Sequence, residues 1–390
     1  MFFIRSVLSS ERTVVAGEQV TYDLPVNPLS FIDLRLTAVA NALGASPVLE
    51  DLLAYITTVE VLWRGSSIVS LSLADLAALV AGLTGEFPKQ ENQGGVASQR
   101  SSMTARIPFG RRKYWGQELL PPVRRGEMQL RLTYAGTLTR AASLIEHIET
   151  VEVPDATPIR FLKYTTFPKT PTAAGDHDVD LPIGNPIINV LLFGTTVPAG
   201  ATETTSIDAL KLLVDNVEFF YSQTRWEELH ADYLARLMPG IADRPSRGHS
   251  LSADPASIAA NTTGLVTVAV PGARVGDVVS MTAQALAVGL VLGEALVTAD
   301  DVVTVQLGNV TVAAVDDVAS LYGYVLWPQA TIRALRQYGW LEFDPFVDPE
   351  LAYALITAGR SRVHLRISAD DTAAIRVVPV EMIAIAPRGA

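Results

Sequence analysis

The densest group of potential metal ligands in the chain is the segment Asp176-His-Asp-Val-Asp180. Its imidazole and three carboxylates are groups that bind divalent cations. In extended backbone, however, alternate side chains point to opposite faces, and Gly175 just before the segment is typical of a loop. We therefore predict a solvated or capping turn at the entry of a strand, and no metal site.

Two other histidines lie among carboxylates. His230 belongs to a helical pattern with no second histidine within helical reach, so an exposed helix face is favoured over a metal site. Its acidic neighbours are Glu227, Glu228 and Asp232. His147 lies between Glu146 and Glu149, and we interpret this group as an ordinary exposed pair.

Sequence signatures of catalysis are absent. The chain has no serine nucleophile elbow and no Gly-Lys-Thr phosphate loop. The carboxylate pairs Asp300-Asp301 and Asp316-Asp317 are adjacent in sequence, so their side chains diverge and indicate turns rather than an acid–base pair. We therefore predict no catalytic residue, no cofactor and no enzymatic activity.

The only basic concentration lies between residues 106 and 125 and is interleaved with Tyr114 and Trp115. One interpretation is a surface that contacts anionic lipid head groups or an acidic neighbouring protein. The other is a solvated loop with Trp115 in the core. Besides Arg106, the candidate contact residues are Arg111, Arg112, Lys113, Arg124 and Arg125.

Composition limits the class of protein. The 390 residues are 49% hydrophobic and 18% charged, with a net charge of −11, which argues against a dedicated or sequence-specific nucleic-acid binder. With no cysteine, disulfides and thiolate chemistry are excluded. The start of the chain lacks a signal-peptide pattern, and the longest apolar stretch, 285–297, is too short to span a bilayer. Such an apolar chain suits large, permanent protein contacts.

The chain repeats itself. Thr21-Tyr-Asp-Leu-Pro-Val-Asn-Pro28 precedes an apolar run at 31–36, and Asp178-Val-Asp-Leu-Pro-Ile-Gly-Asn-Pro186 precedes another at 187–193. A later pair is Gln129-Leu-Arg-Leu-Thr133 and His364-Leu-Arg-Ile-Ser368. Because the segments recur in the same order, we predict two copies of one fold.

Within each copy, short runs of β-branched and large apolar residues predict strands. In the first copy these are 14–24, 31–39, 56–63, 68–73, 128–134 and 149–153, with a polar loop at 86–102. In the second they are 178–181, 187–193 and 209–221.

Each copy also has one predicted helix after its central strands. The first covers 72–83, with Ser72 as N-cap and Gly85 as terminator. The second covers 224–237, where Thr224 and Glu227 form a capping-box pattern.

About 80 additional residues lie between the second helix and the closing strands of the second copy. They contain strand-like runs at 261–270, 278–287, 302–307 and 321–327, separated by Gly, Pro and Asp turns. This pattern predicts a small β-module inserted into a loop. The expected fold is therefore all-β: two tandem jelly-roll β-sandwiches with one short helix each, plus the inserted module.

This arrangement resembles the double jelly-roll major capsid proteins of tailless icosahedral viruses. These include tectivirus- and corticovirus-type phages, adenovirus hexon and the large nucleocytoplasmic DNA viruses. The features that carry the resemblance are the paired Asp23-Leu-Pro25 and Asp180-Leu-Pro182 segments, the strands after them, the paired helices and the loop insertion. The expected domains are 1–155 for the first jelly roll, 156–245 with 329–390 for the second, and 246–328 for the module.

The resemblance implies a structural protein without chemistry. Three chains would form a homotrimeric, pseudo-hexagonal capsomer in a virion assembled in the host cytoplasm, with the module as an outward turret. Partners would be other capsomers, and also minor capsid proteins and an internal lipid membrane. The alternatives are a vertex or spike protein that binds a host glycan, and a tandem β-sandwich carbohydrate-active enzyme.

Overall fold

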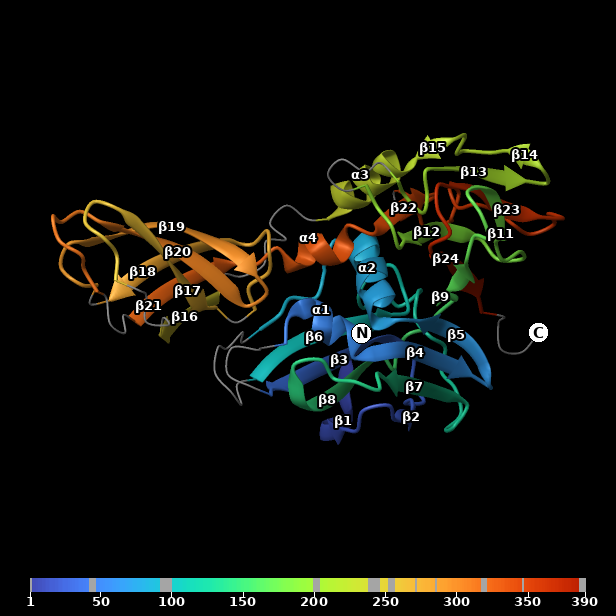
Figure 1. Ribbon diagram of the computed structural model, residues 1–390. Coiled ribbons are helices and arrows are strands. Elements are labelled where there is room, and N and C mark those ends of the chain that lie inside the picture. Colours follow the sequence, from blue (N-terminus) through green and yellow to red (C-terminus); the bar gives the residue numbers. More distant parts are fainter. Residues whose placement is uncertain are drawn as a thin grey trace.

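The computed structural model describes residues 2–41, 47–91, 100–198, 204–237, 246–251, 257–270, 272–284, 286–316, 321–345 and 347–385. Within these residues the strands form five sheets, accompanied by four short helices. Figure 1 shows two packed β-units and a third, smaller one extending to the side. The all-β prediction is confirmed.

The first unit is an eight-stranded jelly roll. One sheet has the order β1-β8-β3-β6, and the strands β2-β7-β4-β5 lie side by side in the facing sheet. Alternation of apolar and polar residues along β7 places every second side chain in the core. The strands are β1 (Ile4–Val14), β2 (Gln19–Asp23), β3 (Leu29–Ala40), β4 (Ile56–Trp63), β5 (Ser66–Leu71), β6 (Arg100–Pro108), β7 (Met128–Tyr134) and β8 (Ala141–Glu152).

The second unit repeats this topology strand for strand. Its sheets have the orders β9-β24-β12-β22 and β11-β23-β13-β14, where β9 and β10 both pair with β24 and together act as the first strand. Strands β14 and β15 likewise both pair with β13 and count as the fifth strand. With the eight strands of each roll numbered in chain order, both rolls have one sheet in the order one-eight-three-six and one in the order two-seven-four-five. The strands are β9 (Arg160–Thr165), β10 (Phe167–Lys169), β11 (Gly175–Asp180), β12 (Ile187–Gly194), β13 (Ala209–Val214), β14 (Val217–Glu218), β15 (Thr224–Arg225), β22 (Tyr338–Glu342), β23 (Val363–Ala369) and β24 (Ile375–Ala384).

The repeated sequence segments occupy equivalent, mutually paired positions. Asp23 ends β2 and pairs with Gln129 of β7, and Asp180 ends β11 and pairs with His364 of β23. The two repeated motifs of each copy are therefore antiparallel neighbours in the same register. This confirms that the internal repeat encodes a repeated fold.

The inserted module lies between the helix α3 (Trp226–Arg236) and β22. It is a sandwich of two three-stranded sheets, β16-β21-β18 and β17-β20-β19, around a hydrophobic core of its own. Its strands are β16 (Ser246–Leu251), β17 (Thr263–Ala269), β18 (Val278–Gln284), β19 (Leu290–Ala299), β20 (Val302–Asn309) and β21 (Leu321–Trp327), and the helix α4 (Ala330–Leu335) follows.

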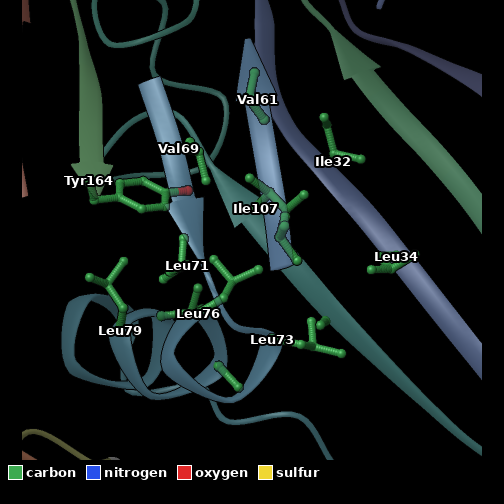
Figure 2. Packing of buried hydrophobic residues seen from close by; sticks show 14 of the residues in the cluster. Ile32, Leu34, Val61, Val69, Leu71, Leu73, Leu76, Leu79, Ile107 and Tyr164 are labelled. Carbon is green, nitrogen blue, oxygen red and sulfur yellow. The ribbon is translucent and has the colours of Figure 1, made fainter. Parts of the chain in front are cut away.

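The helix α2 (Leu73–Thr84) lies between the two rolls (Figure 1). Ser72 caps it by accepting a hydrogen bond from the backbone N–H of Asp75, and Gly85 ends it with a left-handed φ of 73°, both as predicted. Figure 2 shows Leu76 and Leu79 beside strand residues such as Leu71 and Tyr164. The main core extends into the second roll, where its members include Ile188, Leu191, Trp340, Val378 and Met382.

Several predicted boundaries are wrong. The strand expected at 14–24 is the end of β1, a turn and β2, and β6 begins inside the expected loop at 86–102. The strand expected at 209–221 bends back at Asp215 and Asn216, whose φ values of 51° and 67° allow a tight hairpin turn. The first roll also has a second helix, α1 (Leu49–Ala54), which is too short to give a clear periodic signal.

The capping box predicted for the second helix is wrong by one residue. The helix α3 begins at Trp226, and its N-cap is Arg225. The carboxylate that accepts the N-cap backbone N–H belongs to Glu228, at 3.2 Å, rather than to Glu227. Thr224 instead pairs with β13 as part of β15.

Candidate functional site

The segment with the most potential metal ligands, 176–180, is part of the edge strand β11 and not the turn we expected. Asp178 accepts hydrogen bonds from Arg366, at 2.9 Å, and from Arg362, at 3.4 Å. These hydrogen bonds and charges lower the pKa of Asp178. Within the described residues, no group of three histidine or acidic side chains could hold a metal ion.

A histidine that the sequence analysis missed lies beside this strand. The ring of His364 is buried, and its Nε2 lies 3.6 Å from an oxygen of Asp178. Burial, with Arg362 and Arg366 nearby, lowers the pKa of His364. The repeat could have drawn attention to this residue, because its counterpart in the first copy is Gln129, which donates to Asp23 at 3.0 Å.

The two histidines that the sequence places among carboxylates, His230 and His147, have ordinary structural contacts. His230 is half-buried, stacks on Trp226 and has its Nδ1 2.8 Å from the carbonyl oxygen of Tyr338. Its acidic neighbours Glu227, Glu228 and Asp232 are exposed, as expected for a surface helix face. His147 pairs with Glu149 at 3.0 Å, but the exposed pair that we expected is wrong, because both residues are half-buried and Glu146 is fully buried.

The carboxylate pair Asp300-Asp301 forms the turn between β19 and β20, as predicted, but the expected divergence of the two side chains is wrong, because Arg140 lies 3.4 Å from Asp300 and 4.0 Å from Asp301. Asp301 accepts a hydrogen bond from the Gly272 backbone at 2.6 Å. Asp300 lies 3.4 Å from Arg140 of the first roll, so this turn helps to attach the module. Of the second pair, Asp316 is exposed and Asp317 lies outside the described residues.

The structure divides the basic concentration into buried and exposed parts. The loop after β6 carries Arg111, whose side chain is only 3% exposed and donates to Glu118 and to Asp344 of the second roll. Arg160 also donates to Glu118, at 2.9 Å. Arg111 therefore crosses the joint between the rolls and cannot be a surface contact, which corrects that part of the prediction.

The remaining candidates are exposed. Arg112 and Lys113 lie on the same loop, where Lys113 pairs with Glu86 at 2.7 Å, and Arg124 and Arg125 lie in the turn before β7. Half-buried Trp115 has the guanidinium groups of Arg111 and Arg112 each 5.5 Å from its ring. Arg106 forms a two-bond pair with Asp33. In the described part of the chain, none of the helices is long and apolar enough to cross a bilayer.

The basic loop and the inserted module lie at opposite ends of the rolls. Within a roll, each strand runs opposite to the one before it, so the first, third and fifth strands all run in the same direction. Strand β5 is the fifth of the first roll and β9 is the first of the second. Since β5 and β9 pair in parallel, the two rolls point the same way. The module enters before the sixth strand of its roll, whereas the basic loop follows the sixth strand of the other.

Among the described residues, two groups of exposed apolar side chains lie at outer sheet edges of the rolls. The β1 surface lies on an edge strand of the first roll and consists of Phe2, Phe3, Ile4 and Val7. The β14 surface is formed by the edge strand β14 of the second roll, the residues just after it and the segment between β22 and β23, beside a hollow of about 470 Å³. It consists of Val217, Phe219, Phe220, Tyr353 and Ile356.

Comparison with known proteins identifies the fold. No protein-family model and no curated protein sequence matches the chain. Among solved structures, the major capsid protein of bacteriophage PM2 is 11% identical over 100% of both chains, with a TM-score of 0.53.

Two further structures are similar over nearly the full length. The major capsid protein of Sulfolobus turreted icosahedral virus is 11% identical over 98% of this chain and 97% of its own, with a TM-score of 0.55. The capsid of virus PBCV-1 is 7% identical over 98% and 93%, with a TM-score of 0.51. The predicted double jelly-roll fold is confirmed.

Replacing the buried carboxylate at the joint tests its importance for stability. Glu118→Gln removes the charge that faces Arg111 and Arg160, and an uncompensated buried charge costs about 3 kcal/mol or more. We expect the free energy of unfolding in urea to fall by about that amount. The matched control is Glu86→Gln, whose partner Lys113 is exposed and for which we expect a loss below about 1 kcal/mol. Equal losses in the two variants would contradict a buried network.

Replacing the buried histidine tests its contribution to the pH dependence of stability. The pKa of His364 is lower in the folded state than its unfolded value of about 6.5, so below that value the unfolded state takes up the proton first. The contribution of His364 is therefore complete above about pH 6.5 and is lost as the pH falls. Compared with His364→Gln, the unmodified chain should lose more unfolding free energy between about pH 8 and about pH 5. Parallel curves for the two proteins would contradict this assignment.

Proposed function

We propose that this chain is a structural major capsid protein that assembles as homotrimeric, pseudo-hexagonal capsomers in an icosahedral virion. The observation that carries the proposal is one jelly-roll topology present twice, with the copies joined side by side and pointing the same way. Three such chains in a closed ring would bring together six similar units. The shared fold with viral capsid proteins over the full length supports this function.

The position of the module and the position of the basic loop support an assignment of the outer and inner ends of the rolls in the proposed particle. Since the module and the basic loop lie at opposite ends of the rolls, we propose that the module, residues 246–328, is an outward turret. The basic loop would then face the particle interior. The rest of the chain would divide into rolls at 1–155 and at 156–245 with 329–390.

The basic surface, defined as Arg112, Lys113, Arg124 and Arg125, would contact anionic groups there. These are lipid head groups of an internal membrane, or acidic side chains of neighbouring capsomers or minor capsid proteins. Assembly would take place in the host cytoplasm. No nucleic-acid sequence would be read.

The alternatives have less support. In the hollow of about 220 Å³ beside β6, the carboxylate of Asp33 is held by Arg106 and that of Glu86 by Lys113. Carboxylates that are each bound to an arginine or lysine side chain in this way are poor candidates for the acid and base of glycoside hydrolysis. Glycan binding by the module would favour several exposed aromatic rings, but in its described residues Tyr322 and Tyr324 are buried and Trp327, at 41%, is the one that is exposed. We therefore propose no enzymatic role.

The native mass tests the proposed function directly. Light scattering after size exclusion should give a species near three times 41.8 kDa that persists on dilution, because obligate interfaces of roughly 2,000–5,000 Å² dissociate little. Electron microscopy of concentrated material should then show pseudo-hexagonal assemblies. A stable monomer at all concentrations would contradict the capsomer, although the duplicated fold would remain.

Charge reversal tests the basic surface. Arg112→Glu combined with Lys113→Glu should weaken co-sedimentation with vesicles rich in anionic lipid if the partner is a membrane, or slow particle assembly if it is protein. Each pairing charge near a membrane surface is worth about 1 kcal/mol, so the double change should lower vesicle affinity roughly tenfold or more. The matched control is Arg336→Glu, an exposed arginine outside this surface. Unchanged vesicle binding and unchanged assembly would together exclude this role.

A further inference from the structure

The two rolls of one chain are joined through a specific pair of strands. Strand β5, the fifth of the first roll, lies parallel to β9, the first of the second. The register pairs Val69 with Tyr164 and Ser70 with Thr165, and the N–H of Thr166 donates to the carbonyl of Ser70 at 2.9 Å. A fifth-to-first strand contact thus makes one continuous nine-stranded sheet from parts of both rolls.

The equivalent strands at the two outer ends of the chain have free edges. Strand β14 is the fifth of the second roll and pairs only with β13, and β1 is the first of the first roll and pairs only with β8. Within the described residues, these edges therefore leave one fifth-strand edge and one first-strand edge unpaired. Exposed strand edges favour association with another strand unless something covers them.

Both free edges carry the exposed apolar surfaces described above. On the β14 surface, Val217 and Phe220 are each 67% exposed. Phe220 also has a φ of 61°, an uncommon conformation for a bulky residue that the local structure must hold in place. On the β1 surface, Phe3 is 55% and Val7 is 56% exposed. Exposed apolar groups gathered at free sheet edges are typical of interaction sites.

We propose that the β14 surface of one copy docks against the β1 surface of a second copy and so repeats between chains the fifth-to-first contact made within the chain. The occupant is a second copy because the chain itself carries both halves of the contact. This inference rests on the proposed function and names the two faces of the capsomer contact.

Such a contact is head-to-tail, because it joins two different surfaces of the chain. The angle between successive copies therefore decides whether a closed ring or a fibre forms. A heterologous interface closes into a ring when the rotation between copies is right and otherwise extends into a fibre. In a three-membered ring, three internal and three intermolecular contacts of the same kind would alternate. Closure would cover every β1 and β14 edge at once, which also protects the chain from edge-to-edge aggregation.

The absence of cysteine from the sequence allows a clean cross-linking experiment. Val7→Cys and Val217→Cys would be prepared separately and together in the full-length chain, and cross-linked with a short bis-maleimide that tolerates small differences in register. Both positions are exposed, so folding should be unaffected, and this can be checked by urea unfolding. The matched control combines Val217→Cys with Val312→Cys, an exposed valine of the module.

The proposal predicts a specific pattern of covalent products. The double variant should give covalent dimers and trimers with no longer ladder, and co-expressed single variants should give a dimer. Each single variant alone should stay monomeric on a denaturing gel, because the two faces differ. The Val312 control should give at most about a tenth of the double variant's product.

The outcomes that overturn the proposal are distinct. Cross-linking of one single variant with itself would indicate a two-fold contact, and equal cross-linking of the module control would indicate random collision. A native trimer without the expected cross-link would reject this interface but leave the proposed function standing. A native monomer would reject both.

Discussion

The rest of the structure depends on the burial of one helix between two sheets. Helix α2 belongs to the first roll by sequence, but its apolar side chains join a core that includes residues of the second roll. Gly82 of α2 lies so close to the ring of Trp340 that an added Cβ would be 2.5 Å from it. This close approach fixes the distance between the rolls, because a buried indole has little room to move.

Polar contacts at the joint fix the orientation that the apolar contacts leave open. Asp75, in the first turn of α2, is almost fully buried and accepts two hydrogen bonds from Arg376 at 2.8 Å and one from Tyr338 at 2.9 Å. Its position at the helix N-terminus also suits a negative charge. Together with the Arg111 network, these pairs give directional contacts in which a misdocked roll would leave buried charges unpaired. These pairs therefore favour one relative orientation of the two rolls.

The repeat made most of the fold predictable, and this has a physical reason. Segments such as Asp23-Leu-Pro25 and Asp180-Leu-Pro182 end equivalent strands, where the turn chemistry and the buried leucine constrain the residue types. The capped helix at 72–83 was predictable for the same reason, since Ser72 and Gly85 satisfy local backbone requirements. Many features that depend on neighbours in sequence could therefore be predicted, although the N-cap of α3 was misplaced by one residue.

Contacts between residues that are far apart in the sequence could not be predicted. Arg111 looked like part of a basic surface, but its partner Asp344 lies in the other roll, 233 residues away in the sequence. No local pattern encodes that pair. The same applies to His364, whose neighbour Asp178 lies on a strand distant in the sequence, β11.

The composition shows that the chain is unusually apolar, and the fold shows where exposed apolar side chains gather, namely at β1 and β14. Inside the chain, the fifth-to-first strand contact is covered by α2 and its surroundings, whereas the equivalent edges at β1 and β14 expose aromatic and aliphatic side chains. A soluble monomer would gain little from Phe220 held at a left-handed φ in contact with water. The same feature is useful if the edge is one half of a contact. A chain built by duplication carries each half of that contact at opposite ends, so repetition of the internal joint needs no new kind of surface.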